Sequence, residues 1–297
     1  MIDKNIYKIC DKILNITKRR KYSLHEPFFD KGDENSLVQS IKNRSVSTYG
    51  IETLKFEKII KNFTGAKYVH AIINGTSAIH LSLYVAGINQ NTEVLIPALN
   101  YIASSNATLY LKGTPHFIDV DENTLGPDIK KLEIYLKKNT IIKNKKCINL
   151  KTKKNIKAIV ATHVFGHPFE LNKLKKLCDK YKILLIEDAA EALGSYYKNK
   201  HVGTFGLMGI LSFNGNKIIT TGGGGAILTS SKKISEKIKL ISTNAREPHA
   251  WEYKYNELGY NYKMPSLNAN LGISQMKKLK NFLKLKRKLF TMYKNES

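Results

Sequence analysis

Cysteine is scarce in this sequence, and the few cysteines do not form a set that could act together. The 297 residues contain only Cys10, Cys147 and Cys178, which are far apart, with no C-x-x-C pair. An odd number at this spacing argues against a disulfide framework and against a zinc knuckle, and it suits a reducing cytosol. No cluster of His, Cys and Asp has the spacing of metal ligands, so we expect no metal.

Long apolar runs are also missing. No run approaches the roughly 20 residues of a membrane-spanning helix. The first residues, MIDKNIYKICDKILNITKRRK, lack the unbroken apolar segment and the small-residue cleavage site of a secretory signal. We therefore expect a cytoplasmic protein that does not bind a membrane.

Acidic residues are few beside the basic ones. Lys and Arg number 49 and Asp and Glu number 24, so the formal net charge is +25. A charge of this size can indicate binding to nucleic acid or to an anionic membrane. Here lysine is plentiful in every segment, and no RNP, helix-turn-helix or zinc-finger pattern is present. A lysine-rich composition is therefore favoured over a nucleic-acid binder.

What the sequence does have is a regular alternation of short apolar segments and helical segments. Strands are expected within 68–74, 93–99, 114–121, 157–166 and 183–191, and helices within 51–65, 75–88, 101–113 and 170–182. This alternation is typical of βαβ units and a parallel sheet. Because 42% of the residues are apolar, a sizeable core can form. The sequence therefore predicts an α/β fold.

Four segments lie outside this alternation. Residues 1–20 predict an amphipathic helix, with isoleucines at helical spacing, and 21–35 read as a loop. Residues 138–157 have no clean period, and we interpret them as a solvated insertion. Residues 267–295 predict one long basic helix.

The motif NGTSA indicates an anion site. A strand ends before it, Gly75 turns the chain, and Thr76 and Ser77 open a helix. The free N–H groups of a helix start attract a phosphate, and two hydroxyls add donors. Ordinary helix capping explains the motif equally well when it is taken alone.

The motif IEDAAE places two carboxylates at the end of an apolar strand, Glu187 and Asp188. Ligands in open α/β sheets bind at the carboxyl ends of the strands. A carboxylate fixed there can hold a proton on a heteroaromatic nitrogen. Alternatively, the Asp caps the turn that follows the strand.

The stretch SFNGNKIITTGGGG sets one lysine, Lys217, beside four glycines. Residues 209–217 and 224–230 predict two strands that can pair antiparallel around them. Glycine lets a backbone approach a ligand closely, and a lysine in a desolvated pocket can form a Schiff base. Ser212 adds a hydroxyl on the same segment. The plain alternative is a glycine-rich hairpin with a solvated lysine.

Together, in this order, the three motifs meet the needs of pyridoxal 5'-phosphate. That cofactor requires a cradle for its phosphate, an Asp for its pyridinium nitrogen and a lysine for its aldehyde. Tyr101, directly after the expected strand EVLIPALN, is placed to stack on the ring. His163 and His167 lie on the loop THVFGHP and can either touch substrate or serve the structure. His80 is expected to pack.

The ordered set NGTSAIHLSLYVAG, EVLIPALNYIASSNA, PHFIDVDENTLG, IEDAAEALGS, SFNGNKIITTGGGGAILT and LGYNYKMPSLNANLGISQ closely resembles the DegT/DnrJ/StrS-type sugar aminotransferases. The resemblance runs from about residue 22 to the C-terminus. LHEP (24–27), EDAAEALGS and NGNKIITTGGGG look most like the LegC-like subgroup. It implies a fold-type I transferase dependent on pyridoxal phosphate, with a mostly parallel seven-stranded sheet between helices.

The resemblance also implies roles for single residues. Lys217 matches the Schiff-base lysine, and Asp188 matches the partner of the pyridinium nitrogen. Glu191 stands where much of the family has a Gln that bonds the ring hydroxyl, a departure that looks normal for the subgroup. Since the related sugar dehydratases carry His in place of the lysine, Lys217 argues against that activity.

The family's other cofactor contacts match five further positions. Thr76, Ser77 and Ser212 match phosphate contacts, and Tyr101 matches the stacking aromatic. Asn261 resembles an asparagine that reaches across a dimer interface to the neighbouring subunit's phosphate. The resemblance thus implies a homodimer with shared active sites.

The implied reaction is transfer of an amino group, from glutamate, to C4 of a nucleotide-linked 4-keto-6-deoxy sugar in surface glycan biosynthesis. We expect three parts: an N-terminal helical segment (1–45), a large cofactor-binding domain (46–265) and the start of a truncated small C-terminal domain (266–297). The family's remaining part packs over the active site and helps to hold the sugar nucleotide. A truncated, non-catalytic relative that acts in oligomerisation or regulation is therefore the alternative.

Overall fold

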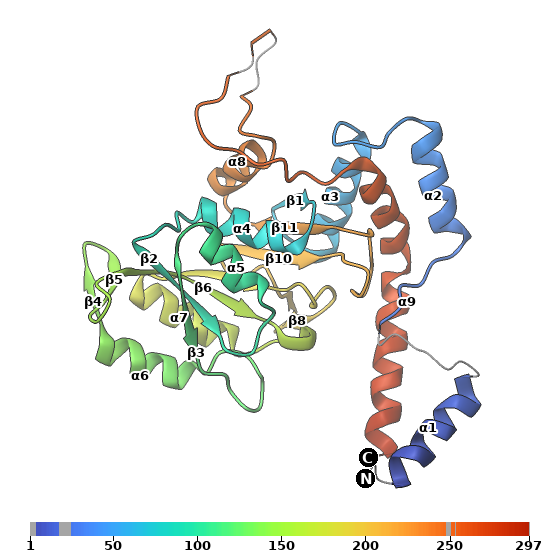
Figure 1. Cartoon of the computed structure of the whole chain (residues 1–297), viewed down its shortest axis with the longest axis horizontal. Helices are drawn as coiled ribbons and strands as arrows, with labels where there is room; N and C mark the ends of the chain where they lie inside the picture. Colours follow the sequence, from blue (N-terminus) through green and yellow to red (C-terminus); the bar gives the residue numbers. More distant parts are fainter. Residues whose placement is uncertain (1–3, 18–24, 248–250, 253, 297) are drawn as a thin grey trace.

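A central β-sheet organises the molecule (Figure 1). The computed structural model describes residues 4–17, 25–247, 251–252 and 254–296. The strands of the main path follow the order β1 (Tyr68–Ile72), β11 (Gly225–Thr229), β10 (Met208–Ser212), β7 (Leu184–Asp188), β6 (Asn155–Thr162), β2 (Thr92–Pro97) and β3 (Thr114–Ile118). Neighbours from β10 to β3 are parallel, whereas β11 runs antiparallel to β1 and β10. The α/β class and the antiparallel pair around the glycines are confirmed.

The expected seven-stranded, mostly parallel sheet needs a correction. Over the described ranges the sheet has nine strands and is mixed. The added strands, β4 (Thr140–Lys143) and β5 (Lys146–Asn149), form an antiparallel hairpin, and β5 also pairs with β6. The interpretation of 138–157 as a solvated insertion is therefore wrong, since Cys147 and Asn149 are buried.

The turn of this hairpin explains why the sequence concealed it. Asn144 and Lys145 both have positive φ, 51° and 58°. Two successive residues of this kind make the tight turn that a twisted hairpin prefers, usually with Gly in second place. Lysine at that place gives no turn signal.

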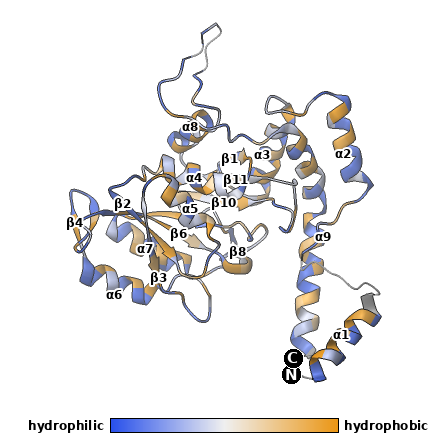
Figure 2. Cartoon of the chain, in the orientation of Figure 1, coloured by the Kyte–Doolittle hydropathy of each residue, from blue (hydrophilic) through white to orange (hydrophobic). Residues whose placement is uncertain are grey.

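Helices cover both faces of the sheet. One face carries α4 (Gly75–Val85), α5 (Ala103–Tyr110) and α8 (Lys232–Ile241); the other carries α3 (Ile51–Thr64), α6 (Ile129–Asn139), α7 (Leu171–Tyr181) and part of α9 (Ser266–Glu296). Two separate apolar clusters fill the interior between sheet and helices. Figure 2 shows the corresponding hydrophobic colouring of the central strands. Small elements, η1 (Val164–Gly166), β8 (Tyr196–Tyr197) and β9 (Lys200–His201), complete the connections.

The N-terminal part forms helices. α1 (Lys4–Thr17) confirms the expected amphipathic helix, although residues 1–3 and 18–20 lie outside the described residues. The loop expected at 21–35 is wrong in its last part, because α2 (Lys31–Lys42) begins there; 21–24, with the first residue of LHEP, are not described. Asp30 caps α2 in a reciprocal box with Asp33, so two short acidic side chains start this helix.

The long basic helix is confirmed as α9, which runs along one side of the sheet and well past it (Figure 1). Its apolar face is buried only in the first half: Leu271 and Leu279 are buried, whereas Leu289 is 46% exposed. In the part of the chain that the structure describes, no helix is both long and apolar enough to cross a bilayer. The three expected parts, 1–45, 46–265 and 266–297, stay a prediction.

Candidate active site

The carboxyl ends of three neighbouring strands meet at one edge of the sheet. β6 ends at Thr162, β7 at Asp188 and β10 at Ser212. The strands are parallel, with Thr162 beside Asp188 and Asp188 beside Ile210. Residues in register on neighbouring strands share a face, so Thr162, Asp188 and Ser212 all point to the side that carries α4. This is the edge where α/β sheets bind ligands.

Helix α4 begins directly over this edge because glycines leave room for it. A Cβ on Gly75 would lie 3.1 Å from the Ser212 Cβ, and a Cβ on Gly225 would lie 2.7 Å from the Asn74 carbonyl carbon. Asn74 caps the helix by accepting the Ser77 N–H at 2.7 Å. The first turn of α4, with Thr76 and Ser77, therefore starts beside the Ser212 hydroxyl and forms a cradle for an anion.

Asp188 is buried at this edge, with 5% of its surface exposed. Its Oδ1 accepts the Ala190 N–H at 3.2 Å. Burial raises the pKa of Asp188 above its usual value, while the Ala190 bond and the nearby His163 and Lys217 act in the opposite direction. A carboxylate in such surroundings gains from a further positive partner, such as a protonated ring nitrogen.

Lys217 lies on a closed loop between β10 and β11. The Phe213 carbonyl accepts the Thr221 N–H at 2.9 Å, and the Asn214 carbonyl accepts the Lys217 N–H at 3.0 Å. The Lys217 side chain is 16% exposed, and its Nζ lies 3.0 Å from Glu191 Oε1. Both side chains line a cavity of about 880 Å³ that reaches α9. The glycines thus let β11 pass the start of α4, and the loop holds the lysine at that edge.

The other carboxylate at the end of this strand, that of Glu187, has a structural role. Glu187 is fully buried and accepts N–H groups from Gly203, Phe205 and Gly206 at 2.6 to 2.7 Å. It also bonds His163 Nε2 at 3.1 Å. Glu187 therefore fixes the turn at 203–206 from the opposite face of the sheet. No local sequence pattern indicates this role, because the partners of Glu187 come from other segments of the chain.

The three histidines considered in the sequence analysis, His80, His163 and His167, lie in different surroundings. His163 is 1% exposed, stacks on Phe169 with a centroid distance of 4.8 Å and bonds Glu187, as a structural histidine does. His167 is exposed and lines the 880 Å³ cavity, where a substrate can reach it. His80 is buried among tyrosines, which confirms its expected packing role.

Two expected cofactor contacts lie elsewhere on the surface. Tyr101, beyond the end of β2, is 74% exposed. Asn261 is exposed and forms a backbone bridge with Thr243. Of the expected site residues, Lys217, Glu191 and His167 line the cavity, whereas neither of these two, nor Asp188, Ser212 or the first turn of α4, is among its described lining residues. Their roles stay predictions.

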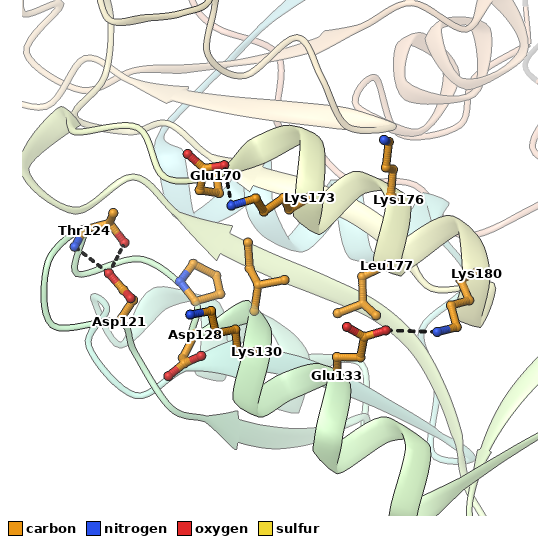
Figure 3. A pocket seen from close by; sticks show the side chains of 12 residues that line it. Asp121, Thr124, Asp128, Lys130, Glu133, Glu170, Lys173, Lys176, Leu177 and Lys180 are labelled. Carbon is orange, nitrogen blue, oxygen red and sulfur yellow. Dashed lines mark hydrogen bonds and ion pairs between the residues drawn. The ribbon is translucent and has the colours of Figure 1, made fainter.

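A second cavity, of about 660 Å³, lies between α6 and α7 (Figure 3). Acidic and basic side chains alternate there: Lys173 pairs with Glu170 at 3.2 Å, and Lys180 with Glu133 at 2.9 Å. None of the expected site residues lines it. Across the described ranges, no group of three or more His, Cys, Asp or Glu is arranged to hold a metal ion.

The residues at the sheet edge fit pyridoxal phosphate. The cradle left open by Gly75 suits the phosphate, the buried Asp188 suits a ring nitrogen that carries a proton, and Lys217 supplies an amine whose charge acts on Asp188. Fold and site together define the class as an α/β transferase that uses this cofactor.

Comparison with known proteins agrees with this class. The model of the DegT/DnrJ/EryC1/StrS aminotransferase family matches residues 29–296, and the chain belongs to this family of sugar aminotransferases dependent on pyridoxal phosphate. The family membership confirms the enzyme class and the cofactor expected from the sequence.

Similar curated proteins cover most of the chain. The putative pyridoxal phosphate-dependent aminotransferase EpsN of Bacillus subtilis is 33% identical, over 93% of this chain and 68% of its own. GDP-perosamine synthase of Escherichia coli O157:H7 is 32% identical, over 91% and 70%. UDP-4-amino-4,6-dideoxy-N-acetyl-beta-L-altrosamine transaminase of Campylobacter jejuni is 34% identical, over 90% and 67%.

Solved structures share the fold. Helicobacter pylori PseC, an aminotransferase involved in the biosynthesis of pseudoaminic acid, superposes with a TM-score of 0.76 at 29% identity, over 88% of this chain and 66% of its own. The sugar aminotransferase Spr1654 of Streptococcus pneumoniae, itself described as putative, gives 0.82 at 21% identity and shows the fold alone. The chain thus spans about two thirds of the length of several relatives.

Proposed function

We propose that this protein transfers an amino group from glutamate to C4 of a nucleotide-linked 4-keto-6-deoxy sugar, in the cytoplasm, for surface glycan biosynthesis. The observation that carries the proposal is the shared sheet edge, where Lys217, Asp188 and the α4 cradle fit one cofactor. Relatives named for perosamine and altrosamine chemistry support the substrate class. The motifs EDAAEALGS and NGNKIITTGGGG support the LegC-like subgroup.

Bound pyridoxal phosphate supplies an aldehyde that condenses with amines and a ring that withdraws electrons from the adjacent carbon. This chain's residues do the rest. Asp188 keeps the proton on the ring nitrogen, because an ionised, buried carboxylate favours a positive partner. Lys217 Nζ takes the proton from the α-carbon of the donor and returns one to the acceptor's C4. Glu191, 3.0 Å from Nζ, holds the amine in place between these transfers.

The cavity beside Lys217 offers a place for the acceptor. Aromatic side chains, Phe165 and Phe290 among them, line it together with the cations Lys286 and Arg287 of α9. Aromatic faces suit a nucleobase, and cations suit a diphosphate. Arg287 Nη2 donates to the Gly194 carbonyl at 3.4 Å, which directs the guanidinium towards the cavity wall.

The test is a reaction with L-glutamate and a nucleotide-linked 4-keto sugar in the presence of cofactor. We expect 2-oxoglutarate and an amino sugar in equal amounts, and neither from Lys217→Ala. Lys180→Ala, which removes a surface lysine paired with Glu133, is the matched control and should keep full activity. Loss of the keto sugar without 2-oxoglutarate would indicate a dehydratase. No reaction of either kind would favour the non-catalytic relative.

A homodimer with shared active sites is part of the proposal. The exposed position of Asn261 agrees with a contact supplied across an interface. Analytical ultracentrifugation with cofactor should give a dimer; a monomer with full activity would contradict this part.

A further inference from the structure

A buried hydroxyl without a partner lies beside Asp188. Thr162 Oγ1 is shielded from solvent and makes no hydrogen bond. Thr162 pairs in register with Asp188, two residues beyond the pair Val160 and Ile186. Those two side chains pack in one apolar cluster on the α4 face. Because side chains along a strand alternate, Thr162 and Asp188 continue the same row towards the cofactor edge.

Thr162 is the half-buried last residue of β6, and its hydroxyl is the part that is shielded. The strand before it, Ile159, Val160 and Ala161, is fully buried and apolar. Valine has the same shape as threonine and would leave no polar atom behind. A buried hydroxyl without a partner costs about 1 to 3 kcal/mol, and a partner gained when a ligand binds is one way in which that cost is offset.

The acceptor that the row places beside this hydroxyl is the Asp188 carboxylate. A carboxylate has about four acceptor sites on its two oxygens, and the Ala190 N–H uses one on Oδ1. The backbone joins the same two segments, because the His163 N–H donates to the Asp188 carbonyl at 3.0 Å. Rotation about the first side-chain bond of Thr162 moves its hydroxyl among three staggered positions on that face of the strand.

We propose that Thr162 is a positioning residue: with cofactor bound, its hydroxyl donates to the Asp188 carboxylate and holds it, ionised, against the cofactor's ring nitrogen. This rests on the proposed function. The charged groups that act on Asp188 are Lys217, His163 and Glu191. Burial raises the pKa of Asp188, so a neutral donor that stabilises the ionised form opposes that burial.

The experiment compares Thr162→Val, which removes the hydroxyl at constant shape, with Thr162→Ser, which keeps it. Cofactor affinity is measured by titration of the bound absorbance band. We expect Thr162→Val to bind about tenfold more weakly, as a bond to a charged group predicts. We expect Thr162→Ser to match the wild type. In an Asp188→Asn background, the valine change should have no further effect.

Three results would overturn the proposal: unchanged affinity in Thr162→Val, equal losses in the valine and serine variants, or the same loss with Asn at 188. Circular dichroism and thermal melts establish that each variant is folded, and Thr162→Ala serves if the valine variant is not. Failure of the proposed function is a different result: wild-type protein would then bind the cofactor but form no 2-oxoglutarate from L-glutamate and the keto sugar, whatever the affinities of the Thr162 variants.

Discussion

At the scale of single residues, the space left by glycines decides the shape of the site. Gly225 touches the backbone of Asn74 and Gly75, so β11 and the start of α4 can lie against each other only without a side chain there. Gly215 belongs to the same glycine-rich stretch but has open space around its missing Cβ. Gly225 is therefore needed because two backbone segments pass close together, whereas an alanine fits at Gly215 without a clash.

Replacing Gly225 by alanine should destabilise the protein by about 1 to 3 kcal/mol, because rigid backbone atoms must move. Gly215→Ala should change the free energy of unfolding by less than about 0.5 kcal/mol. Urea denaturation followed by circular dichroism measures both. Equal stability of the two variants would show that the close approach at Gly225 does not exist in solution.

The residues expected to touch the cofactor could be proposed from the sequence, and those that support them could not. Lys217 and Asp188 belong to motifs whose order alone suggests the chemistry. The role of Glu187 depends on N–H groups 16 to 19 residues away, and Thr162 gains meaning only from its register with Asp188. Neither relation is visible before strands pair.

At the scale of elements, local pattern predicts most strands and helices of the main sheet. The exceptions have different causes. Lys145 adopts a left-handed conformation in the β4–β5 turn without being a glycine, and acidic caps at Asp30 and Asp33 begin a helix inside a stretch that looks like a loop. Helices α6 and α8 were not expected at all.

The contact between α3 and β1 predicts a pH dependence of stability. Glu57 on α3 accepts the Ala71 N–H at 2.8 Å, and burial raises the pKa of Glu57 to about 7. The folded state therefore favours the protonated acid. Its contribution to stability is complete below the unfolded pKa of 4.5 and is lost as the pH rises through about 7.

Glu57→Gln should accordingly gain stability relative to the wild type between pH 5 and pH 8, by about 2 kcal/mol. Burial also lowers the pKa of His70 to about 4, which makes both proteins less stable at low pH. The difference between variant and wild type cancels that effect. Urea denaturation at pH 5 and pH 8 measures the difference in the free energy of unfolding between variant and wild type. Glu122→Gln, a change at the surface, is the control. A pH-independent difference would contradict the burial of an ionisable Glu57.

At the scale of the whole molecule, charge and fold carry different information. The net charge of +25 is spread over the chain, and acidic partners accompany lysines even around the cavity between α6 and α7 (Figure 3). The fold brings motifs more than 100 residues apart to one edge of one sheet, from α4 at Gly75 to the loop at Lys217. That convergence, and not the charge, supports the enzyme class.

The most direct measurement is reduction of the cofactor-loaded protein with borohydride, followed by digestion and mass spectrometry. We expect one dominant cofactor adduct, on the peptide that contains Lys217, with much less in Asp188→Asn and none at that peptide in Lys217→Ala. An adduct distributed over surface lysines, or a dominant adduct on any other lysine, would contradict this expectation.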